Sequence, residues 1–458
     1  MTVLWLLVVP SALLFVSSLN VSRSLRAGQP PIGIATLTVS AAYILAVSLP
    51  AHQLKSHQRS SKLSSLGVGS NIVDIRLARY EFLAALALIC LFLGENIVAI
   101  ARTKLQKPLA STTRTGHQIS DRATYAALLL VGLPYLAVAA QTSRATAFGA
   151  RASTHGQGFL VVLGLCVPLA ASIGVLHHHW RSRALCATSL IAVVLYALLS
   201  GTRSPLVLPA LSFMYVQITD GTRTRSLGRR AVAGLVVLYF SLDIFVGLTS
   251  YRGQIASGQK VSFDQAFVEP LSDPTKNLVS SGGLDTFDGL VLAVNADRSA
   301  VGAKGSDPLK GILNLVPYQI WPNKPTFLSP VVTHYYTDFG GNAGIFLSGP
   351  GYAYLVWGGT VGIIAMWLLL GVSIGKIWHS GSSSIVKIVA LYGVLRFFVA
   401  GDAFDLSYTL NILLALVLGR GLVWMAERLR LHIRGEGSAA PPGLRPSVPG
   451  DSLQTPYP

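Results

Sequence analysis

Three arginines have the chemistry and spacing to bind a strongly anionic group. Arg203 lies in the short segment Gly201–Pro205, Arg252 directly follows Tyr251, and Arg396 lies within an apolar stretch. A guanidinium stays charged and donates paired hydrogen bonds to phosphate oxygens, so two arginines at similar depth could hold a lipid diphosphate. An arginine at the surface of a membrane that binds lipid phosphate would show the same pattern.

One histidine is a candidate general base. His334 is the only histidine in the polar stretch 250–345. Histidine titrates near neutral pH, which suits proton transfer, although a lone histidine is more often structural.

An aromatic segment within this stretch suits a sugar ligand. Residues 317–325 read PYQIWPNKP and contain Trp321 and Lys324. Aromatic rings pack on the apolar faces of sugars, so this segment suggests sugar contacts. Trp and Tyr are equally typical of the membrane interface. The stretch has no Asp-x-Asp pair, so a divalent-metal site for a nucleotide sugar is not favoured, and no cofactor is expected.

The elements that position these residues are predicted to be membrane-spanning helices. The chain is 51% hydrophobic and 12% charged, with mean hydropathy +0.54, whereas soluble domains carry about 25% charged residues. Its apolar runs are long enough to cross a bilayer as helices. We therefore expect an all-α polytopic membrane protein with about 11 transmembrane helices and one large extracytoplasmic loop. The net charge of +17 then indicates anionic lipid contact and no nucleic acid.

The chain divides into four parts. We expect transmembrane helices in 1–249, the large loop in 250–345, further helices in 346–425 and a disordered cytoplasmic tail in 426–458. The tail is rich in Pro, Gly and Ser and cannot bury a core. The expected spans are Val3–Leu19, Ile32–Pro50, Phe82–Ala101, Ala123–Ala140, Gly158–Leu176, Ala184–Ser200, Pro205–Ile218, Ala231–Thr249, Phe346–Gly375, Ile385–Gly401 and Leu406–Met425.

Basic residues give the orientation. Arginines cluster in 223–230 and 420–434, so these segments are placed in the cytoplasm and the large loop outside. The basic segment 51–80 falls outside under this scheme, against the rule, so the topology of the first three helices stays open. Two short apolar patches in the loop, Gly289–Val294 and Ile312–Val316, suggest helices at the membrane interface.

Charged residues within spans are costly and need partners. Glu95 is expected to be structural. Asp243 and Arg396 would lie at similar depth, either as an ion pair between helices or as the lining of a cavity open to the outside.

The order of several motifs resembles the Wzy-type O-antigen or oligosaccharide repeat-unit polymerases. The residues that carry it are LLSGTRSPLVLPAL, TSYRGQ, LVPYQIWPNKPTF and FGGNAGIFLSGPGYAYLVWGGTVGIIAMWLLLG, within roughly 200–375. Each motif alone is weak. The family often has an acidic residue where this chain has Gly349–Gly351, so no role of that residue carries over.

The resemblance implies a metal-independent membrane glycosyltransferase of the bacterial cytoplasmic (inner) membrane. It would polymerise oligosaccharide repeat units linked to polyprenyl diphosphate (undecaprenyl diphosphate) in surface polysaccharide biosynthesis. Arg203 and Arg252 would stabilise the diphosphate. His334 would be the base, with Asp338 or Asp402 as substitutes. The substrate contacts would be Tyr251, Trp321, Lys324, Asp338, Arg396 and Asp402. A chain-length regulator and a flippase of the same pathway are possible partners.

Other functions stay open. An O-antigen ligase uses the same donor and a similar topology, but transfers to another acceptor. A polyprenyl-monophosphate-sugar transferase usually has an acidic motif in its first outer loop, and 20–31 has no acid. A transporter of polysaccharide or lipid-linked glycan would be expected to have more symmetric halves.

Overall fold

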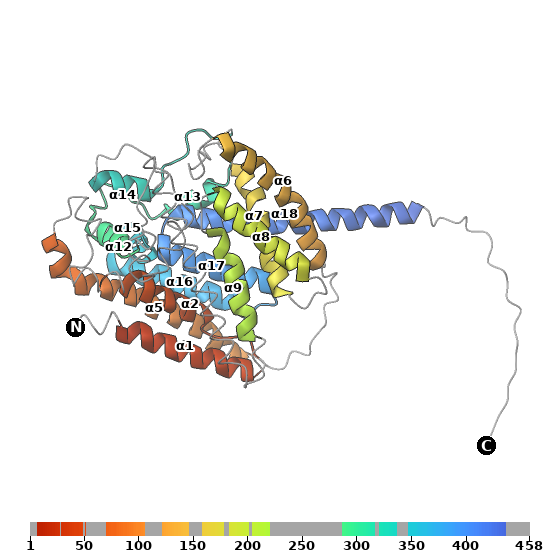
Figure 1. Cartoon of the computed structure of the whole chain (residues 1–458). Helices are drawn as coiled ribbons and strands as arrows, with labels where there is room; N and C mark the ends of the chain where they lie inside the picture. Colours follow the sequence, from red (N-terminus) through yellow and green to blue (C-terminus); the bar gives the residue numbers. More distant parts are fainter. Residues whose placement is uncertain are drawn as a thin grey trace, which may run out of the picture.

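The structure is a computed structural model. It describes residues 7–27, 29–48, 51, 70–105, 121–145, 158–177, 183–200, 204–219, 286–316, 320–336 and 347–436. Within these ranges every regular element is a helix (Figure 1). The all-α prediction is confirmed for this part of the chain.

The elements run in chain order as α1 (Val9–Arg26), α2 (Ile34–Tyr43), the π-helical turn η2 (Ile44–Ser48), α5 (Ser70–Leu105), α6 (Asp121–Ala145), α7 (Gly158–Leu176), α8 (Arg183–Ser200), α9 (Ser204–Thr219), α12 (Thr286–Asn295), α13 (Pro308–Leu313), α14 (Leu328–Tyr336), α15 (Gly349–Trp357), α16 (Gly359–His379), α17 (Ser384–Ala400) and α18 (Ala403–Glu436). The predicted span Ala231–Thr249 lies outside the described residues.

Three of the described helices are long and apolar enough to cross a membrane: Ala78–Ala101, Gly359–His379 and Ala403–Arg430. Shorter apolar helices accompany them in 34–48, 162–176, 205–219 and 286–295. The structure therefore has the character of a membrane protein, while the full set of predicted spans remains a prediction.

The most extensive contact between two described helices joins α5 to α16, which run parallel. A Cβ atom on Gly94 would lie 2.6 Å from the Leu368 carbonyl oxygen, and one on Gly371 would overlap the Leu91 carbonyl oxygen. Small residues that let backbones approach are typical of helix pairs in membranes, where lipid gives no hydrophobic drive for association. These glycines therefore set the distance between the two helices.

Helices α12, α13, α14 and α15 lie at one end of the bundle, which we call the loop end (Figure 1). Helix α12 is buried from Thr286 to Val294. It packs against α5 through Phe287 and Tyr80, whose ring centroids are 6.4 Å apart. The prediction that Gly289–Val294 lies at the membrane interface is wrong, because protein covers all sides of this helix.

The predicted ninth span, Phe346–Gly375, is divided into α15 and α16. Gly358 and Gly359 both have positive φ, 84° and 67°, a conformation that ends a helix at low cost only for glycine. Before α15, Gly349 packs so tightly that a Cβ atom would lie 2.6 Å from the Phe397 carbonyl oxygen. The glycines of 349–351 therefore have a packing role.

The start of α2 lies inside the bundle and is capped by a carboxylate from α5. Glu95 is 3% exposed and accepts hydrogen bonds from the backbone N–H groups of Ala35, at 3.2 Å, and Thr36, at 3.0 Å. The first N–H groups of a helix have no partner within it. Glu95 supplies that partner, which agrees with the expected structural role.

Two glycine-to-alanine substitutions should have different effects on the free energy of unfolding. Gly371→Ala should lower the free energy of unfolding by about 1–3 kcal/mol, because the added methyl group has no room at the α5 contact. Gly421→Ala, where a Cβ atom meets nothing within 4 Å, should be neutral or slightly stabilising, since alanine favours helix. Thermal unfolding in detergent measures both. Equal effects of the two substitutions would contradict the packing account.

Candidate functional site

A group of polar side chains linked by hydrogen bonds and ion pairs lies where α17 ends and α18 begins. We call it the loop-end cluster, and its members are Asp307, Lys310, Asn314, Lys324, Arg396, Asp402, Asp405 and Ser407. They come from three separate segments of the chain: 307–314, 324 and 396–407. Because these three segments are separate in the sequence, only the fold brings them together.

Arg396 and Asp405 form the ion pair of the cluster. Arg396 Nε lies 2.7 Å from Asp405 Oδ1, and the two side chains are 15% and 1% exposed. The guanidinium also donates to the Tyr392 hydroxyl at 3.1 Å and lies 4.1 Å from the centroid of the Tyr408 ring. Arg396 is thus held by α17 and α18 together. The buried guanidinium of Arg396 therefore joins the two helices. Removing one partner of such a buried ion pair is strongly destabilising, because the other charge is left without a partner.

Asp402 joins the starts of two helices. It is 4% exposed. Its Oδ2 accepts the backbone N–H of Ser329 in α14 at 2.9 Å, and its Oδ1 accepts that of Ala403 in α18 at 2.6 Å. In turn Asp405 Oδ2 accepts the backbone N–H of Asp402 at 3.1 Å. The third helical residue of a capping box accepts the N–H of the N-cap residue in the same way. One carboxylate therefore positions α14 relative to α18.

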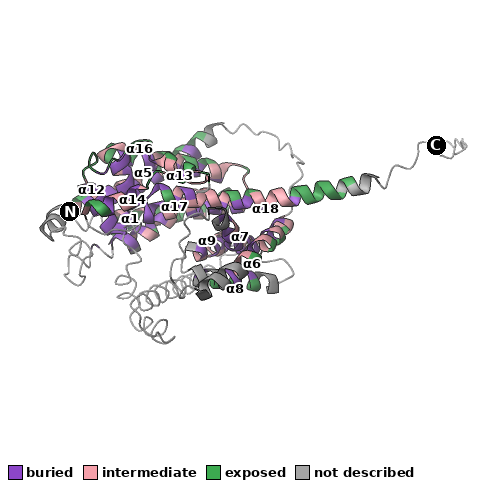
Figure 2. Ribbon diagram, turned by 90° about the horizontal axis from the view of Figure 1, so that it is seen from above, coloured by how far each residue is buried: buried purple, intermediate pink, exposed green. Residues whose placement is uncertain are grey.

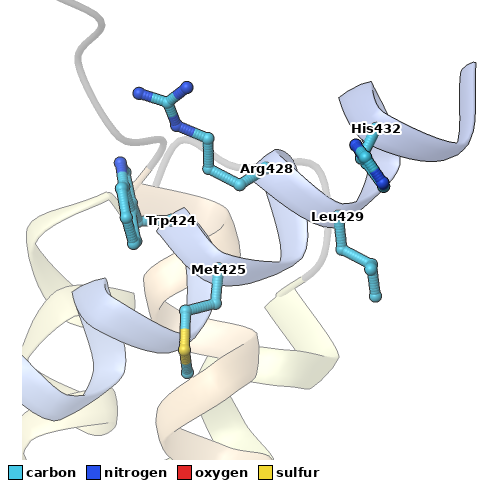
Figure 3. Close-up of a pocket in the computed structure, with 5 residues that line it drawn as sticks. All are labelled: Trp424, Met425, Arg428, Leu429 and His432. Atoms are coloured by element: carbon cyan, nitrogen blue, oxygen red, sulfur yellow. The ribbon is translucent and has the colours of Figure 1, made fainter. Parts of the chain in front are cut away.

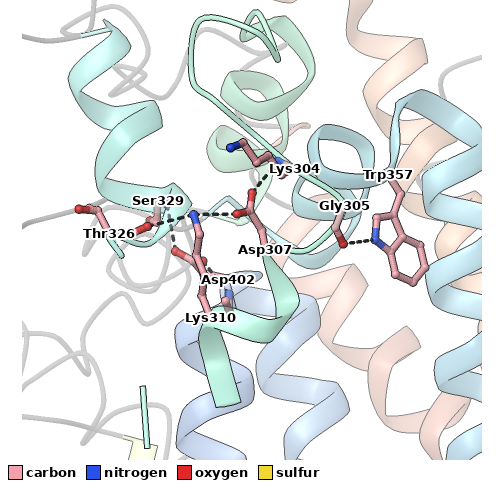
Figure 4. Close-up of polar contacts among 9 residues, drawn as sticks. Lys304, Gly305, Asp307, Lys310, Thr326, Ser329, Trp357 and Asp402 are labelled. Carbon is pink, nitrogen blue, oxygen red and sulfur yellow. Dashed lines mark hydrogen bonds and ion pairs between the residues drawn. The ribbon is translucent and has the colours of Figure 1, made fainter. Parts of the chain in front are cut away.

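A lysine makes a second connection to α14 (Figure 4). Lys310 Nζ lies 2.7 Å from Asp307 Oδ1 and donates to the Thr326 carbonyl oxygen at 3.2 Å. Asp307 Oδ2 accepts the backbone N–H of Lys304 at 2.8 Å. The turn before α13 is thus linked to the segment that leads into α14.

Lys324 is linked to α18 through one intermediate residue. Its Nζ donates to the Asn314 carbonyl oxygen at 2.9 Å, and Asn314 Nδ2 donates to Ser407 Oγ at 3.0 Å. Burial lowers the pKa of Lys324. The ammonium group of Lys324 is therefore partly buried, at the edge of the cluster.

Burial, with a smaller contribution from the nearby Asp405, raises the pKa of Asp402 to about 7. The hydrogen bonds from Ser329, Ala403 and Leu328 act in the opposite direction but do not compensate. A carboxyl group with a pKa near neutral can exchange protons at physiological pH.

The structure brings three of the predicted site residues to the cluster: Lys324, Arg396 and Asp402. His334 lies in the last turn of α14 with its side chain exposed, and Trp321 is half-buried in the segment before α14. Four predicted residues, and the proposed ion-pair partner of Arg396, lie outside the described residues: Arg203, Tyr251, Arg252, Asp338 and Asp243.

Sequence reasoning missed the members of the cluster that hold it together. Asp405, Asn314 and Ser407 were not singled out. Asp402 and Asp405 are separated by three positions at the start of an apolar helix, a spacing typical of a helix N-terminus. That signal could have assigned both carboxylates to capping. The contacts of Asn314 have no sequence signal.

A shallow pocket lies far from this cluster, on the exposed last turns of α18 (Figure 3). It is lined by Trp424, Met425, Arg428, Leu429 and His432. All five side chains come from one helix. This pocket is a surface feature of α18 and adds nothing to the loop-end cluster.

Within the described ranges, no group of three His, Cys, Asp or Glu side chains could hold a metal ion. Comparisons with protein-family models, with curated proteins and with solved structures found no match.

The pH dependence of stability should reveal the buried carboxyl of Asp402. In the unfolded chain this group ionises near pH 3.9, but in the folded protein it ionises near pH 7. Between these values the unfolded chain binds fewer protons, so stability is lost as the pH rises. In thermal unfolding experiments, the free energy of unfolding of the wild type should decrease by about a few kcal/mol at most between pH 4 and pH 8.

The matched variants are Asp402→Asn and Asp297→Asn, the second at an exposed carboxylate between α12 and α13. Asp402→Asn should remove most of this decrease, whereas Asp297→Asn should keep it. The same slope in both variants and in the wild type would contradict the assignment.

Proposed function

We propose that the protein is a membrane glycosyltransferase that polymerises polyprenyl-diphosphate-linked oligosaccharide repeat units into a surface polysaccharide. The observation that carries the proposal is the loop-end cluster, in which Lys324, Arg396 and Asp402 lie together at one end of an apolar helical bundle. A site at the end of a bundle suits a substrate with a lipid tail and a polar head. The order of motifs in 200–375 supports the same function.

In the proposed reaction, a hydroxyl oxygen of the incoming repeat unit forms a bond to the anomeric carbon of the growing glycan. The bond between that carbon and the diphosphate oxygen breaks, and polyprenyl diphosphate leaves with the electron pair. The hydroxyl proton passes to a base, for which His334 is the candidate. Arg203 and Arg252 would stabilise the charge that develops on the diphosphate, as fixed cations do.

The contacts of two residues refine their proposed roles. Arg396 is paired with Asp405 and lies against Tyr408, so we assign it to the support of the site. Asp402 holds the start of α14, and α14 carries His334 near its other end. Asp402 would thus set the position of the base, while Lys324 and Trp321 remain candidates for substrate contact.

Chain-length analysis of the polysaccharide in cells tests the proposal. Deletion of the gene should leave single repeat units, and Arg203→Ala and Arg252→Ala should each shorten or abolish the polymer, because the leaving group loses a cation. Arg428→Ala, at an exposed arginine of α18, is the control and should leave chain length unchanged.

Protein amounts in the membrane must be equal in all variants. If long polymer persists in both the Arg203 and Arg252 variants, the roles assigned to them are wrong. If deletion leaves full-length polymer on its lipid carrier, the protein is a ligase.

A further inference from the structure

Helix α13 presents an apolar face to its surroundings. Its opposite side packs on α18, where a Cβ atom on Gly311 would lie 2.5 Å from the Ala403 carbonyl oxygen. Three apolar side chains on one face of the helix are exposed, by 56%, 55% and 39%: Leu309, Ile312 and Leu313. A short helix in water would not be expected to expose this much apolar surface at one place.

This patch continues along α18. The face of α18 on which α13 packs, at Ala403 and Leu406, has exposed apolar side chains farther along the helix, at Leu414, Val417, Trp424 and Met425. Ala403, where α13 packs, and Trp424 are 21 residues apart, which corresponds to about 30 Å along a helix. The hydrocarbon core of a bilayer is also about 30 Å thick. The apolar strip from α13 to Trp424 thus has the length of one membrane crossing.

Both ends of the strip have the residues of a membrane boundary. At the far end, where α18 leaves the bundle (Figure 2), the guanidinium of Arg428 lies 5.5 Å from the centroid of the Trp424 ring. Trp and Arg are enriched at the level of lipid headgroups, where long basic side chains extend to the phosphates. At the α13 end, Lys310 and Lys324 lie beside the apolar patch, at the same level as the start of α18.

We propose that α13 is an interfacial anchor, whose side chains Leu309, Ile312 and Leu313 insert between the acyl chains of the leaflet at the loop end. Its partner is the lipid bilayer. The patch is continuous with the exposed face of a candidate span, Ala403–Arg430, and that face must be covered by lipid if the helix crosses the membrane. A helix that lies in the interface with its apolar face buried in this way is a common means of fixing a protein's depth.

The anchor would fix the height of the loop-end cluster. Gly311 contacts the first residue of α18, and Lys310 binds the segment that precedes α14. The cluster would therefore sit at the level of the headgroups. This inference does not depend on the reaction proposed above, and it would hold for any substrate.

Depth measurements by spin labelling test the anchor in the full chain reconstituted into liposomes. A nitroxide is attached to a cysteine at Ile312, and its collision rates with oxygen and with a water-soluble nickel complex are compared. Val417→Cys, 65% exposed in the middle of α18, is the lipid reference. Ser306→Cys, exposed just before α13, is the water reference. The wild type, treated with the label, corrects for reaction at its own cysteines, of which Cys90 and Cys166 are buried.

The anchor predicts that the ratio of oxygen to nickel collisions at Ile312 is several-fold higher than at Ser306 and approaches the value at Val417. A ratio equal to that of Ser306 would place α13 in water and overturn the proposal. Low collision rates with both reagents would overturn it too, because the face would then be covered by protein, either a second copy or another partner. A circular dichroism spectrum unchanged by labelling shows that each variant is folded.

Discussion

The loop end depends on one requirement, that backbone N–H groups at helix starts inside an apolar bundle must find acceptors. Each helix leaves its first N–H groups without an internal partner, and a buried polar group without a partner is costly. Carboxylates meet this need twice, with Glu95 at the start of α2 and Asp402 at the starts of α14 and α18. Asp405 then accepts the Asp402 N–H and balances Arg396. Charges in an otherwise apolar protein are thus used to join helix starts.

Glycines make this arrangement possible because they allow helix starts to approach one another. Gly401, with φ of 58°, lies so close to Ser348 that no side chain could fit. Ser348 itself has a positive φ of 59° and caps α15 by accepting the Gly351 N–H. The starts of α15 and α18 therefore meet beside Asp402. A strained residue held in this way by its surroundings is often found near functional sites, which is consistent with the proposed location of the reaction.

Much of the helical framework could be predicted from the sequence, because apolar runs have a clear length and composition. The predicted span Gly158–Leu176 coincides with α7, and Ile385–Gly401 differs from α17 by one residue at each end. The end of the last helix was harder to predict. Helix α18 continues to Glu436, ten residues past the expected boundary of 426, because the Ala, Glu, Arg and Leu residues that follow Met425 are strong helix formers.

Tertiary contacts could not be predicted in the same way. The run Gly289–Val294 is apolar both in an interfacial helix and in a buried one, and only its packing against Tyr80 and α15 distinguishes the two. Of the candidate site, residue type selected Lys324, Arg396 and Asp402, but not their neighbours. Asp405 lies nine residues from Arg396 across a turn, a separation that fixes no contact until the turn at Gly401 is known.

Hydrogen exchange at the start of α14 tests most directly the claim that Asp402 holds this helix to α18. Backbone amide exchange of 328–336, measured by mass spectrometry on the full chain in liposomes, should be slow in the wild type and much faster in Asp402→Ala. Exchange in α7 should stay the same, which separates loss of this contact from general unfolding. Unchanged exchange in α14 after removal of the carboxylate would contradict the account.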